Sequence, residues 1–328
     1  MTKRILKSTA ALRSTLAVLL VLSFLALPQA ALAWGTATHV YIAKRLGQQL
    51  GLANAQEMYG ATLPDFPTLM FGYQHSPYLY TQTHSQFMNL VRLAPLGYQR
   101  ALAYGFASHN EEWGADFTAH RQALGGGVGG YVNQKLPAVT GPLYSYVVEF
   151  LTVAKVSNAV QVATALTPVL ADTCIESAVD LLVSENEFAG VGVEMMLASG
   201  LRASFAPTLL TSAYAKGLAD TAGISQSAAA AIISAAEAKN REYLTTYGAL
   251  LTQANRRDLL AETIAQLAEQ LLKDQYSLTV DVPAALIAEG LDAAKLSVQS
   301  DYSTELAATV KHVGTQLQRH WIFTSLIP

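Results

Sequence analysis

A dense cluster of ionisable residues lies between residues 108 and 120, in the sequence Ser-His-Asn-Glu-Glu-Trp-Gly-Ala-Asp-Phe-Thr-Ala-His. Four of these side chains are potential metal ligands on one stripe of a helix that turns by about 100° per residue: His109, Glu112, Asp116 and His120. His109 and His120 would lie about 16 Å apart along a straight helix. They can therefore serve two neighbouring ions with Asp116 between them, as in multi-metal sites. A solvated polar helix face is the plainer alternative.

A second set of carboxylates recurs every fourth residue, at Asp172, Glu176 and Asp180. Like charges at this spacing repel one another on an isolated helix. A bound metal ion would relieve that repulsion. Taken by itself, however, this stripe favours the interpretation of a solvated acidic face.

Further candidate ligands lie nearer the start of the chain. The sequence Trp-Gly-Thr-Ala-Thr-His begins at Trp34, directly after a predicted cleavage site. A free α-amine titrates near about 7.7–8.0, so a new amino terminus at Trp34 can chelate metal with its amine and carbonyl oxygen, close to His39. Asp65 and His84 lie in an irregular, proline-rich segment, where His84 is favoured over His75. Aspartate and histidine together suit zinc, which takes oxygen and nitrogen ligands.

Helices must position these residues, because apolar residues recur at i, i+3 and i+4 through most of the chain. The clearest predicted helices cover residues 40–50, 98–120, 144–156, 172–183, 226–251, 257–272 and 303–320. Only residues 276–282 have a strand-like pattern, which ends at Pro283. The predicted fold class is therefore all-α.

Residues 1–33 have the pattern of a secretory signal peptide. Four basic residues precede an apolar run, which ends in the cleavage motif Ala31-Leu32-Ala33. The sequence thus predicts an exported protein, either periplasmic or secreted. Removal of this segment takes away four basic residues and no acidic ones, which changes the formal net charge from −3 to −7. Such a surface is poorly suited to a polyanion such as nucleic acid.

The composition of the chain changes near Glu187. Residues 34–186 contain five of the seven histidines, whereas residues 187–328 consist largely of alanine-rich helical patterns. We therefore interpret residues 34–186 as a catalytic region and residues 187–328 as an accessory α-helical region. A second helical layer on the same core is the alternative.

Taken in order, these residues resemble the zinc-dependent phospholipase C family, which shares its fold with the fungal single-strand-specific nucleases. Trp34 is similar to the amino-terminal ligand of that family, and its spacing to His39 resembles the nuclease branch. The segment from Gly60 to Asp65 resembles the Gly-x-x-x-Pro-Asp of the phospholipase branch, and Thr83-His84 resembles its Thr-His. The resemblance implies a multi-helix bundle with metal ligands at Trp34, His39, Asp65, His84, His109, Asp116, His120, Asp172 and Glu176.

The sequence departs from the family pattern at two places. The residue four after His109 is Trp113 instead of aspartate, so that Asp116, or failing that Glu112, takes the bridging role. Asp172 stands where the family has histidine. This second departure implies that one zinc is bound more weakly, is replaced by a harder ion, or is missing, which leaves two or three ions in all.

The resemblance implies hydrolysis of phosphodiesters by metal-activated water, with Asp65 as both a ligand and the general base. Phospholipids are the favoured substrate, and the aromatic run 66–80 can make peripheral contact with a membrane. A single-strand nuclease of the same fold is the alternative, although the negative charge weighs against it. A third hypothesis is an exported helical protein that binds metal without catalysis, for which Asp172 is the best support.

Overall fold

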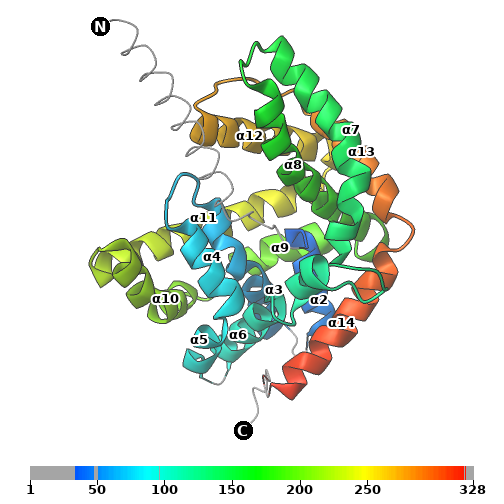
Figure 1. Cartoon of the computed structure of the whole chain (residues 1–328). Helices are drawn as coiled ribbons and strands as arrows, with labels where there is room; N and C mark the ends of the chain where they lie inside the picture. Colours follow the sequence, from blue (N-terminus) through cyan, green and yellow to red (C-terminus); the bar gives the residue numbers. More distant parts are fainter. Residues whose placement is uncertain (1–33, 48–50, 96, 321, 323–328) are drawn as a thin grey trace, which may run out of the picture. The chain divides into compact units, whose positions relative to one another are not determined.

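A computed structural model describes residues 34–47, 51–95, 97–320 and 322 of the chain (Figure 1). The predicted signal peptide, residues 1–33, lies outside these described residues. The described parts are helical and contain no β-strand. The predicted all-α fold class is therefore confirmed.

The described helices include α-helices, one 3-10 helix (η1) and two π-helical turns (η2 and η3). In chain order they are α2 (Thr36–Leu46), α3 (Leu52–Thr62), η1 (Leu63–Leu69), α4 (Ser76–Ser85), α5 (Met88–Leu93), α6 (Tyr98–His109), η2 (Phe117–Arg121), α7 (Tyr131–Val153), α8 (Ala159–Leu182), η3 (Val183–Glu187), α9 (Val191–Gly200), α10 (Ala206–Ala222), α11 (Gln226–Leu251), α12 (Arg256–Tyr276), α13 (Ala284–Val298) and α14 (Tyr302–Arg319).

The agreement with the predicted ranges varies along the chain. Helix α11 coincides with the predicted range 226–251, whereas α7 and α8 both begin 13 residues before their predicted starts. The early turns of these two helices contain prolines, at positions 137 and 142 in α7 and at position 168 in α8. Proline usually marks the end of a helix in a sequence pattern, which explains why the first turns of both helices escape prediction.

The strand predicted at residues 276–282 is wrong. Helix α12 extends to Tyr276, and the residues after it cross to α13 as irregular backbone. The backbone N–H of Val282 donates instead to Glu269 Oε1 on α12, at 2.8 Å. A strand needs a neighbouring strand to complete its hydrogen bonds, and the described part of the chain offers none at this place.

The continuous helix predicted over residues 98–120 is also wrong, because it is interrupted at Asn110. Helix α6 ends at His109. The side-chain oxygen of Asn110 then accepts hydrogen bonds from the backbone N–H groups of Glu112, Trp113 and Gly114, at 2.8, 2.9 and 3.2 Å. Asparagine is a favoured helix N-cap, and here it starts a new turn that leads into η2.

Helices α3 and α6 cross with their backbones in direct contact, which two glycines allow. A Cβ atom on Gly60 would lie 2.1 Å from the carbonyl oxygen of Leu102, and one on Gly105 would lie 1.9 Å from that of Glu57. No side chain larger than hydrogen fits at either position. The crossing brings Gly60, in the last turn of α3, against the middle of α6, and η1 follows directly from α3.

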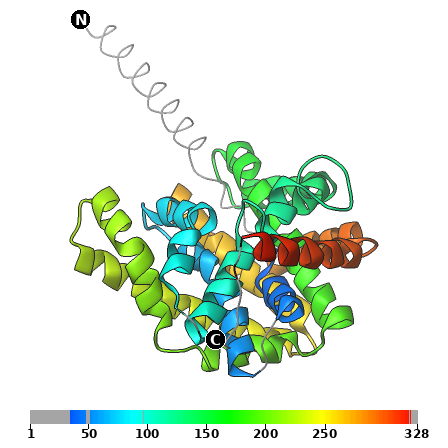
Figure 2. The ribbon, with the colours of Figure 1, turned by 90° about the horizontal axis from the view of Figure 1, so that it is seen from below.

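Helix α8 packs against α7 and α13 and also contacts α2 (Figure 1). Helix α14 lies beside α2 (Figure 2). The described residues belong to one compact unit, and nearly all of their buried apolar side chains, from Trp34 to Ile322, belong to one cluster. The proposed boundary after residue 186 lies within η3, and buried apolar side chains of the described helices on both sides of it belong to this cluster.

Among the described helices, none combines the length and the apolar character that a bilayer span requires.

The α3–α6 crossing predicts the effect of Gly105→Ala. We expect it to lower the free energy of unfolding by about 1–3 kcal/mol, because overpacking against a backbone carbonyl separates the helices. In a helix without such a neighbour, the same change would stabilise the protein by about 1 kcal/mol. Urea unfolding followed by circular dichroism measures the difference.

Gly200→Ala is the matched control, because no atom lies within 4 Å of a Cβ at that helical position. Its free energy of unfolding should stay at the wild-type value or rise by up to about 1 kcal/mol. A Gly105→Ala protein as stable as the wild type would contradict the close crossing.

Candidate metal centre

Eight of the nine predicted ligands converge in the structure. They form three groups, and within each group one ligand atom per residue lies within 4.8 Å of the others. The groups are His39–His109–Asp116, Asp65–His84–His109 and His120–Asp172–Glu176. Buried histidines and carboxylates are thus arranged so that they can hold metal ions.

Most of these residues lie near a helix end or in an irregular turn. His39 is in the first turn of α2, Asp65 is in the 3-10 helix η1, and His84 is in the last turn of α4. His109 is the last residue of α6, and Asp116 immediately precedes η2. Side chains at helix ends can point along the helix axis instead of outward from it. Several helices can therefore direct their ligands to one point.

The tightest set of donor atoms comes from Asp65, His84, His109 and Asp116. Asp65 Oδ1 lies 3.4 Å from His84 Nε2 and 3.5 Å from His109 Nε2. Asp116 Oδ2 lies 3.3 and 3.0 Å from the same two nitrogens, which are 3.2 Å apart. A tetrahedron with corners about 2.0–2.1 Å from its centre has edges of about 3.3–3.4 Å. The five distances given above are close to these edges, and the four residues Asp65, His84, His109 and Asp116 are called the tetrahedral set below.

Backbone carbonyl groups fix the tautomers of two of the histidines. His109 Nδ1 lies 2.7 Å from the carbonyl oxygen of Ala61, and His84 Nδ1 lies 2.9 Å from that of Tyr80. A carbonyl oxygen can only accept, so each Nδ1 must carry the hydrogen. In the neutral ring, the lone pair of Nε2 then points to the centre, which is the usual support of a metal-binding histidine.

Asp116 connects this tetrahedral set to His39. Its Oδ1 lies 3.2 Å from His39 Nε2, while its Oδ2 faces the other two imidazoles. The ring of His39 also stacks on that of His109, with centroids 3.9 Å apart. One buried carboxylate thus offers an oxygen to each of two adjacent groups, which suits two neighbouring cations. Glu112, the alternative bridging residue, is exposed and belongs to none of the three groups.

The buried groups shift one another's pKa values. Burial acts to raise the pKa of Asp116, but the adjacent His109, together with His39 and His84, holds it well below its usual value. Burial likewise acts to lower the pKa of His109, but Asp116 and Asp65 raise it well above its usual value. The pKa of His39 is lowered by burial and by the neighbouring His109. The carboxylates therefore require positive charge beside them, which either protons or metal cations supply.

The third group is formed by His120, Asp172 and Glu176. His120 Nε2 lies 3.5 Å from Glu176 Oε1. His120 belongs to the π-helical turn η2, a type of turn that occurs frequently at functional sites, and the two carboxylates lie one turn apart on α8. The interpretation of this stripe as a solvated acidic face is wrong, because Asp172, Glu176 and Asp180 are all buried.

Trp34, the ninth predicted ligand, has its side chain anchored beside η2. The indole Nε1 donates a hydrogen bond to Thr118 Oγ1 at 3.0 Å, and the ring stacks on Tyr131 at 5.2 Å between centroids. The role of the Trp34 amine stays a prediction, because it concerns the chain after removal of residues 1–33. His75, the competitor of His84, contacts the side chain of Gln74 instead and belongs to none of the three groups.

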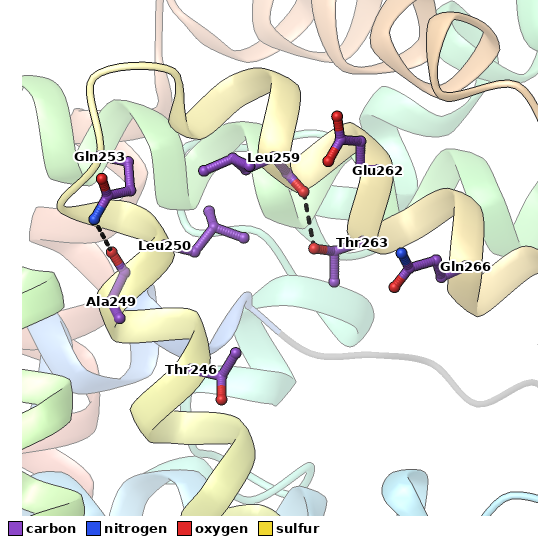
Figure 3. A pocket seen from close by; sticks show the side chains of 8 residues that line it. All are labelled: Thr246, Ala249, Leu250, Gln253, Leu259, Glu262, Thr263 and Gln266. Carbon is purple, nitrogen blue, oxygen red and sulfur yellow. Dashed lines mark hydrogen bonds between the residues drawn. The ribbon is translucent and has the colours of Figure 1, made fainter.

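A surface groove of about 320 Å³ between α11 and α12 is separate from these groups (Figure 3). Its lining is formed by eight residues, of which only Glu262 carries a charge. None of the eight is a member of a metal-binding group. The groove is therefore not part of the candidate metal centre.

Asp180 supports the centre without belonging to any of its metal-binding groups. Its Oδ1 accepts hydrogen bonds from the backbone N–H and the hydroxyl of Thr38, at 2.7 and 2.6 Å. Its Oδ2 accepts from the N–H of Ala37 at 3.0 Å and from the hydroxyl of Tyr247 at 2.9 Å. Burial raises the pKa of Asp180 to about 6, although these hydrogen bonds act to lower it. The carboxylate thus caps the start of α2 from another helix.

Gly35 makes this cap possible, because a Cβ there would lie 2.5 Å from the carboxylate carbon of Asp180. The cap fixes the helix turn that carries His39. The sequence shows Asp180 only as the third member of an acidic stripe. Its role as a cap depends on a contact between residues 142 positions apart, which no local pattern reveals.

Comparisons of the chain with models of protein families, with curated proteins and with solved structures give no match. The geometry of the site is therefore the basis for any functional conclusion.

The cap predicts the effect of Asp180→Asn. The amide has only one acceptor oxygen, so an NH₂ group would face one of the two backbone N–H groups of α2. We expect a loss of about 1–3 kcal/mol in the free energy of unfolding, together with weaker binding of divalent metal at His39. Urea unfolding and metal titration measure the two effects. Asp220→Asn, at an exposed position on α10, is the control, and equal behaviour of the two variants would rule out the cap.

Proposed function

We propose that this protein is an exported, zinc-dependent phosphodiester hydrolase that acts on phospholipids, with water as the attacking nucleophile. The observation that carries the proposal is the tetrahedral set around His109, in which Asp116 also reaches His39. Neighbouring cations about 3.5–4 Å apart are used to hold the attacking and leaving oxygens in phosphoryl transfer. A carboxylate shared between two ligand groups supports an arrangement of that kind.

The donor atoms fit zinc. His39 Nε2, Asp65 Oδ1 and both oxygens of Asp116 are buried and complete no hydrogen bond of acceptable geometry with the described residues. Buried polar atoms of this kind require a partner, and a cation at their common centre would be one. Imidazole nitrogens with carboxylate oxygens are the donor set that zinc takes at tetrahedral sites.

We assign one zinc ion to the tetrahedral set, a second to His39 on the other side of Asp116, and a third cation to the His120 group. Since His109 Nδ1 donates to Ala61, its single remaining nitrogen serves one ion only, in the tetrahedral set. The second ion would be held by His39, by Asp116 Oδ1, and by the amine and carbonyl oxygen of Trp34 in the processed chain.

Zinc in these positions would polarise a phosphoryl oxygen and make water acidic enough to attack near neutral pH. We assign Asp65 as the proton acceptor, because its side chain is 19% exposed whereas that of Asp116 is fully buried. Burial acts to raise the pKa of Asp65, but His109 and His84 together hold it below its usual value. The carboxylate is thus ionised at neutral pH and can accept a hydrogen bond from an attacking water.

Two features favour a lipid over a nucleic acid. The formal net charge of −7 after removal of residues 1–33 repels a polyanion. Phe71, which directly follows Met70 beyond the end of η1, is 44% exposed, whereas Phe66 and Leu79 of the same aromatic run belong to the core. Phe71 is thus placed where it can touch a lipid surface, although a single exposed apolar side chain is also common on soluble proteins.

The tetrahedral set predicts the effect of His109→Ala on the processed protein, residues 34–328. We expect the variant to lose bound zinc and to hydrolyse phosphatidylcholine at least about 100-fold more slowly. The loss of a metal ligand should reduce activity more than the loss of a residue that only positions a ligand. Mass spectrometry of the bound metal and release of phosphocholine from mixed micelles measure the two quantities. His75→Ala, which removes a histidine outside the groups, should change neither.

The same assay discriminates among the functional alternatives. Cleavage of single-stranded DNA without lipid hydrolysis would favour the nuclease. Bound zinc without hydrolysis of either substrate would favour a non-catalytic metal-binding protein. Absence of zinc from the purified protein would contradict the proposal as a whole.

The proposed role of Trp34 predicts the effect of one extra residue before it. An added glycine replaces the α-amine by an amide, which is a much weaker ligand, and we expect the zinc affinity of one site to fall at least about tenfold. Competition with a chelator measures the affinity. Unchanged zinc content and affinity would show that the amine is not a ligand.

A further inference from the structure

We propose that the group formed by His120, Asp172 and Glu176 binds an exchangeable divalent cation that prefers oxygen ligands, with Mn²⁺ as its probe, instead of a third tightly held zinc. The inference rests on the proposed function, because it concerns a neighbouring part of the same metal centre.

The donor set of this group differs from that of the tetrahedral set. It contains two carboxylates and one imidazole, whereas the tetrahedral set balances two carboxylates with two imidazoles. Imidazole strengthens binding to zinc more than to Mn²⁺, while carboxylates and water suit Mn²⁺, Mg²⁺ and Ca²⁺. The advantage of zinc is therefore smaller at the His120 group.

The carboxylates of this group are buried and lie close enough together to share a cation. Glu176 is only 4% exposed, and its Oε1 completes no hydrogen bond of acceptable geometry with the described residues, although it lies 3.5 Å from His120 Nε2. Asp180, one turn further along α8, already accepts hydrogen bonds at both of its oxygens from α2 and Tyr247. The group formed by His120, Asp172 and Glu176 is thus distinct from the cap, and a cation would stabilise the ionised form of its carboxylates.

The His120 group is slightly exposed to solvent, which would allow a bound cation to exchange. His120 and Asp172 are 8% and 9% exposed, whereas His109 and Asp116 are 0% exposed. Three protein ligands leave further positions to water, which an octahedral ion uses more readily than a tetrahedral one. A cation held by this group can therefore leave under conditions that retain the ions at Asp116.

The test uses the processed protein, residues 34–328, loaded with zinc and then dialysed against a weak chelator. We expect two zinc ions per chain to remain and one Mn²⁺ to bind afterwards, as measured by mass spectrometry and by electron paramagnetic resonance. Asp172→His should retain a third zinc and weaken Mn²⁺ binding at least about tenfold. Asp220→His introduces the same side chain on the exposed face of α10, and it should behave like the wild type.

A wild-type protein that retains three zinc ions and takes up no Mn²⁺ overturns the inference, as does an Asp172→His variant with wild-type metal contents. If Asp172→His fails to fold, Glu176→Gln replaces it and must lose Mn²⁺ binding while it keeps two zinc ions. If the wild-type protein also lost the other two zinc ions on dialysis, that result would contradict the proposed function but not this inference. A single Mn²⁺ that depends on Glu176 would still support this inference.

Discussion

The buried carboxylate of Asp116 is the constraint on which the rest of the site depends. Its two oxygens face imidazoles carried by α2, α4 and α6. A charge in the protein interior must be compensated, and the removal of one partner leaves the others uncompensated. The ends of three helices are therefore held around one side chain that itself lies outside a long helix. This explains why His39, His84 and His109 lie at or near helix ends.

Three backbone features produce this convergence. The glycine crossing of α3 and α6 places His109 next to the carbonyl oxygen of Ala61. The Asn110 cap ends α6 and redirects the chain so that Asp116 returns to His109. Asp180 ties the start of α2 to α8. Each feature satisfies backbone groups that would otherwise be unpaired at a buried helix end. The contacts that stabilise the fold are therefore also the contacts that position the site residues.

The side chains that converge in the candidate metal centre could be predicted from the sequence more fully than their geometry. Residue type and order indicate eight side chains that the fold brings into three groups. The helix break at Asn110 escaped the periodic pattern, although asparagine is a common N-cap and offered a signal. The cap by Asp180 had no such signal, because its partners Ala37 and Thr38 lie far away in the sequence. Periodicity describes one helix at a time, whereas these contacts join helices that are distant along the chain.

The crossing of α3 and α6 bears on whether the donor atoms are positioned before or after metal binds. Because backbone atoms meet there without intervening side chains, the imidazole of His109 is oriented by the fold itself. The conformational entropy of assembling the donors is therefore lost while the chain folds, and little remains to be lost when an ion arrives. For the ions proposed above, this geometry predicts that the chain folds first and that metal binds afterwards.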